Sequence, residues 1–484
     1  MLGVAPQGCC LNATGQDLGQ NTKRNGDMST FARTLAAMAV SAALVAPAAH
    51  ATNGYFKIGY GTKNRGMAGA GIAFSQDSLA PATNPSGIAL VGNRMEAGVE
   101  LFNPNRHGRL DATMMGGADT GKVDSGATLF AIPHAGFSFD MRDFAVGLSM
   151  TANGGMNTRY NSNLYANGFG PAVPGFAAAL GQPTPSFPNT GTLGVNLSQL
   201  IIAPTVAKKL NEDHSVGASL LIGYQRFRAY GLGLFQGLSS APASVTNQGD
   251  DDAWGAGVRI GWTGQITDSI TLGAQYSSKI RMQEFDKYKG LFAEQGDFDI
   301  PANFGVGIAV KMTPKTTLAF DVQRIQYGDV AAIANDGPTA AEFFGGLTGV
   351  LTGNPAMVSN PLGTDTGWGF GWDDITVYKL GINHEYNDRW TLRAGLNYGE
   401  NPIDNDQNLF NILAPGVVEK HITLGFTYMP SPMNEISVTY MHAFSTKQSN
   451  VYSADLGAPF GTLGYTADIG MDQNALEVSY AFKF

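Results

Sequence analysis

Apolar and polar side chains alternate along most of the chain that follows residue 94. In the run 421–428, one face carries Ile422, Leu424, Phe426 and Tyr428, and the other carries His421, Thr423, Gly425 and Thr427. Similar runs occur at 391–398 and 435–444. Because successive side chains of a strand point to opposite faces, each run predicts a strand with one apolar face. A soluble sandwich alternates in the same way, but runs of about ten residues match a tilted strand that crosses a membrane.

Short and long connections follow each other in turn between these predicted strands. The short ones are 141–143, 211–213, 267–268, 313–315, 387–388 and 431–434. The long ones are 105–127, 153–197, 230–250, 284–299, 328–371, 400–417 and 447–470. Short turns at one end and long loops at the other are typical of bacterial outer-membrane barrels, which have an even number of strands. The pattern predicts an all-β fold, an antiparallel transmembrane barrel of about fourteen strands.

The end of the chain is a further alternating run. Leu476, Val478, Tyr480, Phe482 and Phe484 share one face of it. We interpret this run as the strand that closes the barrel. A terminal aromatic residue on such a strand resembles the signal that the outer-membrane assembly machinery reads.

The stretch 64–87 has the period of neither a strand nor a helix. Its glycines are Gly66, Gly69, Gly71 and Gly87, and its prolines are Pro81 and Pro85. Glycine lets backbone approach other backbone closely and proline fixes turns, so the stretch predicts a compact, irregular segment. We expect residues 52–93 to form an N-terminal hatch that plugs the lumen, and residues 94–484 to form the barrel.

Residues 28–51 have the pattern of a secretory signal peptide. Arg33 supplies the positive charge, 35–45 is apolar, and Ala49-His50-Ala51 is a small-x-small cleavage site. We interpret residues 1–51 as this signal with an upstream extension, and Met28 as the start of translation.

Both cysteines, Cys9 and Cys10, precede the predicted signal. A mature chain that begins at Thr52 would therefore have no disulfide and no thiol chemistry.

Composition narrows the class of protein further. Charged residues make up 14% of the chain, against about 25% in average soluble domains. Glycine contributes 63 of 484 residues, and the mean hydropathy of −0.07 is too low for a helical membrane protein. Low charge and abundant glycine fit a barrel with one lipid-facing and one polar face. The net charge of −9 excludes nucleic acid as a partner, because no basic stripe is present to neutralise phosphates.

The sequence carries no recognisable catalytic motif. It has no His-Glu-x-x-His and no Gly-x-Ser-x-Gly, and no Cys follows the predicted signal. An outer-membrane lipase would pair Ser with His, but His442 and Ser445 fall on opposite faces of one predicted strand. The acidic run 250–252 lacks the ligand spacing and the glycine of a calcium loop. We predict that the protein is not an enzyme and has neither a cofactor nor a metal site.

The irregular N-terminal stretch also resembles a known family. Arg65-Gly66 is followed by small residues, then by Asp77-Ser78 and Asn84-Pro85-Ser86. This order resembles the hatch of the FadL-type outer-membrane transporters of long-chain fatty acids and other hydrophobic compounds, a family that includes TodX-like transporters of aromatic hydrocarbons. The family's Asn-Pro-Ala is Asn84-Pro85-Ser86 here, and Ser is still small enough for a tight turn. The resemblance implies a fourteen-stranded barrel in the bacterial outer membrane and assigns Arg65, Gly66, Asn84, Pro85 and Ser86 to the hatch.

A candidate gate follows the third predicted strand, 143–150. Paired glycines in a strand mark a bulge or a kink, and Asn153-Gly154-Gly155 stands at this point. In the family that the chain resembles, the third strand is kinked inward and opens a hole in the barrel wall, so the resemblance implies a lateral gate at Asn153, Gly154 and Gly155. The alternative is that the glycines only begin a surface loop.

Candidate ligand-binding residues come from the long loops and the N-terminus. Leu234 and Phe235 lie in one loop and Leu291 and Phe292 in another, where exposed apolar groups usually signify binding. Packing of one loop on the other is the alternative. A carboxylate head group would need a cation, for which Arg226, Arg228, Lys279 and Arg281 are candidates. The resemblance adds Tyr55 and Phe56, because the N-terminus of the family reaches into the barrel.

The sequence therefore predicts an outer-membrane transporter. We expect uptake of long-chain fatty acids or related hydrophobic molecules by diffusion, with exit through the barrel wall. Uptake of aromatic hydrocarbons is the alternative within the family, and a general porin or an adhesin is a further one. The expected partners are the hydrophobic ligand, outer-membrane lipid and lipopolysaccharide, and the outer-membrane assembly machinery. We expect a monomer.

Overall fold

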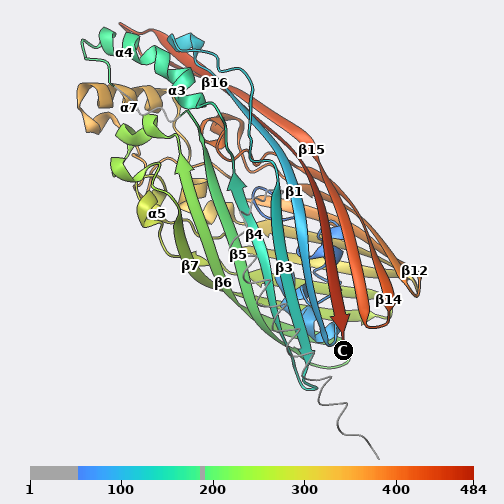
Figure 1. The fold of residues 1–484 in the computed structure, drawn as a ribbon. Coiled ribbons are helices and arrows are strands. Elements are labelled where there is room, and N and C mark those ends of the chain that lie inside the picture. The colour runs from blue at the N-terminus through green and yellow to red at the C-terminus, as the bar shows by residue number, and fades with distance from the viewer. Residues whose placement is uncertain (1–52, 186–190) are drawn as a thin grey trace, which may run out of the picture.

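The computed structural model describes residues 53–185 and 191–484 of the chain. The predicted signal peptide and its extension, residues 1–51, lie outside the described residues. The strands form one sheet that closes on itself (Figure 1). The barrel strands are β1 (Arg94–Asp111), β3 (Phe130–Asp140), β4 (Ala145–Asn157), β5 (Gly194–Lys209), β6 (His214–Tyr230), β7 (Asp251–Thr267), β8 (Ile270–Ser277), β10 (Asn303–Thr313), β11 (Thr316–Ile325), β12 (Ile375–Asn387), β13 (Trp390–Gly399), β14 (Lys420–Ser431), β15 (Asn434–Asp455) and β16 (Thr462–Lys483).

Each barrel strand pairs antiparallel with its neighbour, and the first and last strands close the ring. The register of β1 on β16 runs from Arg94 opposite Lys483 to Asp111 opposite Thr466. Two further strands of two residues each, β2 (Val123–Asp124) and β9 (Arg281–Met282), pair with β1 and β7. Removing these two from the 16 strands of the sheet leaves fourteen barrel strands among the described residues. The predicted all-β, fourteen-stranded antiparallel barrel is confirmed.

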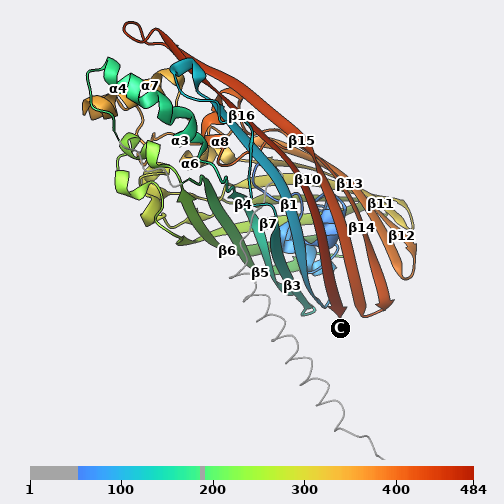
Figure 2. The ribbon, with the colours of Figure 1, turned by 45° about the horizontal axis from the view of Figure 1, so that its top comes forward.

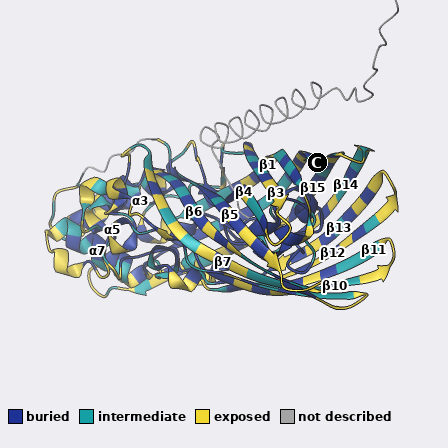
Figure 3. Cartoon of the chain, turned by 90° about the horizontal axis from the view of Figure 1, so that it is seen from below, coloured by how far each residue is buried: buried dark blue, intermediate teal, exposed yellow. Residues whose placement is uncertain are grey.

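Burial alternates along the strands, with buried and exposed residues following each other (Figure 3). In β14, the residues predicted to share the apolar face point outward: Ile422 is 38% exposed and Leu424 is 57% exposed, whereas His421 and Thr423 are buried. Exposed apolar side chains form an outward face on the other strands too, among them Val99, Leu101, Leu148, Leu220, Val258, Ile260, Val306, Ile382, Leu392, Leu396 and Val478. A barrel with an apolar exterior fits a lipid environment. No helix among the described residues is long and apolar enough to cross a membrane.

The N-terminal segment 53–93, called the hatch below, lies inside the barrel at the end where the C-terminus also lies (Figures 1 and 2). It contains α2 (Thr62–Gly66) and the 3-10 helices η1 (Ala80–Ala82) and η2 (Pro85–Leu90). α2 packs against β13, β14, β15 and β16, and η2 packs against β4, β5, β6 and β7, so the segment spans the lumen. This is the position expected of a plug.

Buried ion pairs join the hatch to one side of the wall. Arg65, 1% exposed, pairs through Nη1 with Glu100 of β1 at 2.8 Å and through Nε with Glu477 of β16 at 2.8 Å. Lys57 also pairs with Glu100, at 2.6 Å, and Lys63 pairs with Glu435 of β15. Charges buried in a protein are tolerated when each one is paired, so these contacts fix where the hatch can lie.

Hydrogen bonds join the hatch to the other side of the wall. The Asn84 amide donates to the carbonyls of Ile72 at 2.7 Å and Trp262 of β7 at 3.0 Å, and its oxygen accepts from the backbone N–H of Ser86 at 3.1 Å. Gly261 of β7 faces this turn, and a Cβ there would lie 2.0 Å from Asn84 Oδ1. The turn therefore seats on the wall only because position 261 has no side chain.

The long loops gather at the end of the barrel opposite the C-terminus and carry short helices (Figure 1). The α-helices are α3 (Leu164–Phe169), α4 (Val173–Ala179), α5 (Ala293–Gly296), α6 (Ala331–Ala334), α7 (Ala340–Thr352) and α8 (Asn408–Asn411). The 3-10 helices are η3 (Thr113–Met115), η4 (Gly170–Ala172), η5 (Gly233–Leu238), η6 (Pro242–Ser244), η7 (Asp286–Tyr288), η8 (Tyr327–Asp329), η9 (Pro355–Met357) and η10 (Asn405–Gln407). In an outer-membrane barrel the loop end is extracellular.

One predicted loop is wrong. The segment 447–470 belongs largely to β15 and β16, which continue past the other strands as a hairpin (Figure 2). Above the membrane, the inner face of this hairpin packs on loop helices: the Tyr465 ring lies 5.1 Å from that of Phe169 and 5.8 Å from that of Phe343. In the lower part of these strands the apolar side chains point outward to lipid, whereas in the hairpin they point inward to the loops. The apolar–polar alternation that identified the strands is therefore out of phase at this point.

Candidate transport site

The predicted gate lies at a break in β4. The pairing of β4 with β5 shifts register between Ala152 and Gly154, which leaves Asn153 as an extra residue. Residues 150–157 are all buried, unlike the alternating lower part of the strand. The upper half of β4 therefore bends toward the lumen, as a β-bulge bends the strand that contains it. This part of β4 continues as a strand and does not begin a surface loop.

The bend opens the ladder between β3 and β4. These two strands pair only over 135–140 and 145–150. Above that point β3 pairs with β1 and β4 pairs with β5, and no described strand bridges 130–134 to 151–157. Pro133 lies in this unpaired part of β3, where a missing N–H is tolerated. We call this break the wall opening.

The start of the hatch lies against the bent strand. Phe56 forms an antiparallel bridge with Gly154, and the Lys57 N–H donates to the carbonyl of Asn153 at 3.2 Å. A Cβ on Gly154 would lie 2.0 Å from the carbonyl oxygen of Tyr55. Only glycine permits this contact between the hatch and the bend. Tyr55 and Phe56, two candidate ligand residues, are thus buried beside the wall opening.

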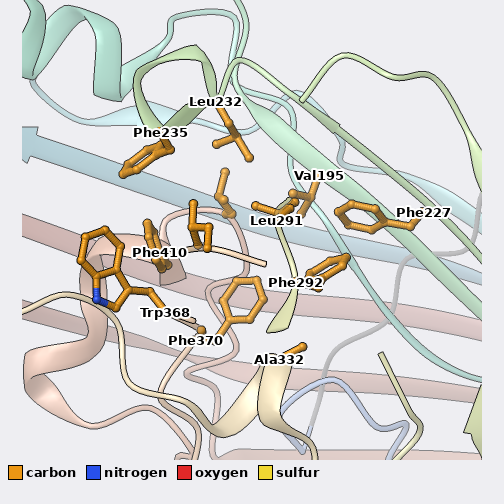
Figure 4. A pocket seen from close by; sticks show the side chains of 13 residues that line it. Val195, Phe227, Leu232, Phe235, Leu291, Phe292, Ala332, Trp368, Phe370 and Phe410 are labelled. Carbon is orange, nitrogen blue, oxygen red and sulfur yellow. The ribbon is translucent and has the colours of Figure 1, made fainter. Parts of the chain in front are cut away.

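An apolar pocket with a cavity volume of about 30 Å³ lies among the loops, with side chains that converge on it from several loops (Figure 4). Its lining residues are Val195, Phe227, Leu232, Phe235, Leu291, Phe292, Ala332, Leu362, Trp368, Gly369, Phe370, Phe410 and Leu413. None of these carries a charge. The apolar and aromatic lining is typical of a site for a small apolar ligand. Three of the predicted loop residues, Phe235, Leu291 and Phe292, line this pocket, and Leu234 is buried but does not line it.

A strained turn holds the loop that carries Leu291 and Phe292. Glu294 and Gln295 have φ of 52° and 58°, values that non-glycine residues rarely adopt. Beyond the turn, burial and, to a lesser extent, the neighbouring Asp299 raise the pKa of the Asp297 carboxyl to about 7. Strain of this kind persists where the surrounding structure enforces it, so the position of this loop is well determined.

A second, smaller cavity of about 10 Å³, called the inner cavity, lies between the apolar pocket and the hatch. It is lined by Tyr55, Arg106, Gly155, Met156, Asn157, Trp372, Ala414, Pro415, Gly416 and Met471. The two cavities share a wall, because Phe370 and Leu413 line one while Trp372 and Ala414 line the other. The Trp372 ring lies between the two cavities, 6.4 Å from the Phe370 ring and 6.0 Å from the Tyr55 ring.

An open cleft lies above the wall opening, called the outer cleft. It is lined by Ala127, Phe130, Asn157, Thr158, Arg159, Thr192, Asn196, Arg228, Ala229, Tyr230, Asn247 and Gly249. Asn157 borders both this cleft and the inner cavity. The inner cavity at the bend in β4 therefore adjoins the apolar pocket on one side and the outer cleft on the other.

The four candidate head-group cations lie elsewhere. Arg226 and Arg228 are on the outward face of β6, paired with Asp252 at 2.7 Å and with Asp250 at 2.8 Å. Lys279 pairs with Asp299 at 3.1 Å, and Arg281 is exposed. None of the four lines the apolar pocket or the inner cavity, and Arg228 lines only the outer cleft. This placement argues against a role in binding a head group inside the barrel.

Several lining residues escaped the sequence analysis. Trp368, Phe370, Trp372 and Phe410 lie in the predicted loops 328–371 and 400–417 or just beyond them, where no period distinguishes a lining residue from a packed one. Arg106 lies on β1 among other inward-facing polar residues, so its type and position alone did not single it out. Among the described residues, no group of three or more His, Cys, Asp or Glu is placed to hold a metal ion.

A plugged fourteen-stranded barrel with an apolar exterior and apolar internal cavities defines an outer-membrane transport protein for hydrophobic compounds. The sequence model of the family described as outer membrane protein transport protein (OMPP1/FadL/TodX) matches residues 189–484. The chain belongs to this family, whose members are transport channels of the bacterial outer membrane.

Solved structures agree with the fold. The toluene transporter TodX of Pseudomonas putida is 18% identical, with 88% of this chain and 99% of that chain covered and a TM-score of 0.58. A FadL homologue of Pseudomonas aeruginosa is 18% identical, with 89% and 100% covered and a TM-score of 0.61. The toluene transporter TbuX of Ralstonia pickettii is 17% identical, with 88% and 99% covered and a TM-score of 0.56. At such identities the likeness extends to the fold alone. No curated protein sequence matches the chain.

Proposed function

We propose that the protein takes up long-chain fatty acids or related hydrophobic molecules by diffusion and releases them sideways through the wall opening. The main support for this proposal is the bend of β4 at Asn153. Because of the bend, residues 130–134 of β3 and 151–157 of β4 do not pair with each other, and an internal cavity lies beside this gap. A closed ladder would force cargo along the barrel axis, where the hatch lies. A lateral exit leads apolar cargo into lipid instead, where it is more stable than in water.

The proposed route begins at the extracellular loops. Cargo enters the apolar pocket, passes Trp372 into the inner cavity and leaves between β3 and β4. Movement of the hatch segment that contacts Gly154 accompanies the exit, because Tyr55 and Phe56 lie against the bend. The hatch residues Arg65, Gly66, Asn84, Pro85 and Ser86 hold the rest of the plug in place. No step needs an energy source, because the cargo moves down its own gradient.

Neutral aromatic hydrocarbons are the second candidate cargo. The observation in their favour is that the apolar pocket is lined by Phe227, Phe235, Phe292, Trp368, Phe370 and Phe410 and by no charged residue. The toluene transporters with a similar fold carry this class of cargo by their names. The barrel would act as a monomer surrounded by outer-membrane lipid and lipopolysaccharide after insertion by the assembly machinery.

The test is uptake by cells that lack their own transporter of this kind. We expect the protein to accelerate the initial uptake of radiolabelled oleate or toluene, and Gly155→Leu to reduce it severalfold, because Gly155 lines the inner cavity and leucine would fill it. Gly175→Leu is the matched control, since a side chain at this site on α4 meets nothing within 4 Å. Uptake no faster than in empty cells, or unchanged by Gly155→Leu, would reject the proposed route.

A further inference from the structure

The outer cleft is the largest of the three spaces described above. Its volume is about 600 Å³, against about 30 Å³ for the apolar pocket and about 10 Å³ for the inner cavity. Ligand sites in proteins have volumes of about 300–1,000 Å³, so of the three spaces the outer cleft alone has room for a sizeable ligand without rearrangement. Unlike the apolar pocket, it has charged lining residues, Arg159 and Arg228. The ligand that it fits therefore has a polar part.

The outer cleft lies on the outer side of the wall, where β4 bends toward the lumen. Asn157 of β4 lies opposite Asn196 of β5, and Asn196 lies opposite Arg228 of β6. On the other side of the cleft, Phe130 begins β3. The side chain of Arg228 points outward and is 47% exposed. The cleft is therefore an indentation between β3 and β5 that opens to the outside, directly above the wall opening.

An aromatic pair marks the level of the membrane surface on this side of the barrel. Tyr224 of β6 lies opposite Trp254 of β7, with ring centroids 4.9 Å apart, and Trp254 is 47% exposed. Outer-membrane barrels carry such side chains at the interface between lipid and water. Below this pair the outward face is apolar, with Leu220 and Val258 both 50% exposed. Arg228 lies above the pair on the same face, about 13 Å along the strand from Tyr224, and so at the level of the lipid head groups.

The two arginines suit a phosphate group, because a guanidinium donates parallel N–H groups to phosphate oxygens. Arg228 uses Nε for its ion pair with Asp250 at 2.8 Å, which leaves its Nη groups for a ligand. Arg159 is exposed and has no carboxylate partner in the described part of the chain. The amides of Asn196 and Asn247 also line the cleft and suit the hydroxyl groups of a sugar. The lining therefore fits a phosphorylated sugar.

The surroundings of the cleft favour a lipid over a soluble compound. A head group in the cleft has the lipid-facing wall directly beneath it, where Leu148 of β4 is 45% exposed. Acyl chains attached to such a head run down over the wall opening and cover apolar surface there. A soluble phosphorylated sugar would fill the cleft alone and leave this surface without a partner.

We propose that the outer cleft binds the phosphorylated sugar head of an outer-leaflet glycolipid through Arg159 and Arg228, and that the acyl chains of this lipid cover the wall opening from outside. The second part rests on the proposed function and deepens it by naming the lipid partner of the exit. Cargo that leaves between β3 and β4 then meets bound hydrocarbon and not water.

The first experiment compares two lipids that differ only in phosphate. Equilibrium binding of radiolabelled lipid A, with both of its phosphates or with neither, is measured on the full-length protein purified in a non-ionic detergent. We expect the wild type to bind the phosphorylated form about tenfold or more tightly, from charge-assisted hydrogen bonds. Arg159→Gln/Arg228→Gln should reduce this preference to about twofold or less, because the paired donors are lost. Binding of the phosphate-free form should not change.

Arg226→Gln/Arg281→Gln is the matched control, because it removes the same charge near the loop end but neither residue lines the cleft. It should retain the wild-type preference. An equal loss in the two double variants, or no preference in the wild type, would overturn the site. Excess inorganic phosphate at constant ionic strength should not displace lipid A, and displacement would assign the cleft to a soluble phosphate instead. If Arg159→Gln/Arg228→Gln does not fold, Arg159→Gln alone decides.

A second measurement tests the cover over the wall opening. Lipid A with photoreactive acyl chains should crosslink to 130–134 and 145–157 more than to β11 and β12, across the barrel, and should lose this preference in Arg159→Gln/Arg228→Gln. Even labelling around the barrel would overturn the cover. Loss of lipid binding with uptake intact would reject this inference alone, whereas bound lipid without any uptake would support the site and reject only the transport route.

Discussion

At the scale of single residues, the partners of a charged side chain inside the barrel indicate whether its role is structural or functional. Arg65 is surrounded by two carboxylates from two strands that meet at the barrel seam, so its contacts close the ring and hold the hatch at once. The extracellular Arg109 also has three carboxylate neighbours, but it is 32% exposed. Water competes with the second set of ion pairs and not with the first.

We therefore expect Arg65→Met to cost about 3–5 kcal/mol of unfolding free energy, because it leaves Glu477 buried without its arginine and leaves Glu100 with Lys57 but without its arginine. Arg109→Met should cost about 1 kcal/mol or less. Guanidinium unfolding of the protein in lipid vesicles, followed by tryptophan fluorescence, measures both. Equal losses in the two variants would contradict the distinction between buried and exposed pairs.

At the scale of elements, the bend of β4 depends on a single extra residue. The backbone of Asn153 has no pairing residue on β5, and the strand is in regular register on both sides of it. Removing one residue at this point would bring the side chains of 154–157 back into phase with the inward and outward alternation of 145–152. A straight β4 can then extend its ladder with β3 over 130–134 and close the wall opening.

Deletion of Asn153 should therefore abolish lateral exit while the barrel still folds. The measurement is uptake of the same labelled cargo, with heat-modifiable gel mobility as the check on folding. Asn153→Ala is the control, because it removes the side chain but keeps the extra residue and the carbonyl that accepts from Lys57. A deletion variant that still transports at the wild-type rate would show that cargo does not leave through the wall.

The elements also show where sequence reasoning reaches its limit. The strands 391–398 and 421–428 were predictable, because a lipid face imposes a period of two on every residue that touches it. The hairpin beyond 447 was not, since its Tyr465 packs against Phe169 and Phe343 of other loops and does not face lipid. The bulge beside Gly154 was predictable because paired glycines mark bulges, and the lateral gate at this point stays a prediction.

The cavities were harder to predict than the gate. The apolar pocket is assembled from loops that lie far apart in the chain, so no local pattern brings Phe227, Trp368 and Phe410 together. The cation candidates stay a prediction, and local sequence could not give their placement: Arg226 and Arg228 have the right charge, but the parity of β6 turns them outward toward Asp252 and Asp250. Arg106 instead lies on the inward face of its strand, β1, which only the pairing of β1 with β16 reveals.

At the scale of the whole molecule, the hatch is held from opposite sides by different chemistry. Ion pairs to β1, β15 and β16 fix one side, and hydrogen bonds to β7 and β11 fix the other. On the second side, Asp321 of β11 accepts from the backbone N–H groups of Gly71 at 2.7 Å and Ile72 at 2.9 Å. The Asn84 turn adds the contacts to β7. Because separate contacts hold the two sides, the proposed route would need only the start of the hatch at Tyr55 to move while the remainder stays fixed.

This arrangement predicts a barrel that transports without leaking, and a leak that appears only when one whole side is released. Combined with Arg259→Met, which removes the β7 donor to the carbonyls of Pro81 and Ala82, the double variant Asn84→Ala/Asp321→Ala releases the β7–β11 side. The hatch should then swing on its ion pairs and admit small sugars in a liposome-swelling assay. The wild type should show no swelling above protein-free liposomes. Asn105→Ala, which breaks a single exposed hydrogen bond to Asp472 on the loop side, is the control and should behave as wild type. Swelling already present in the wild type would instead indicate an open porin, and a combined variant as tight as wild type would mean that the ion pairs alone keep the lumen closed.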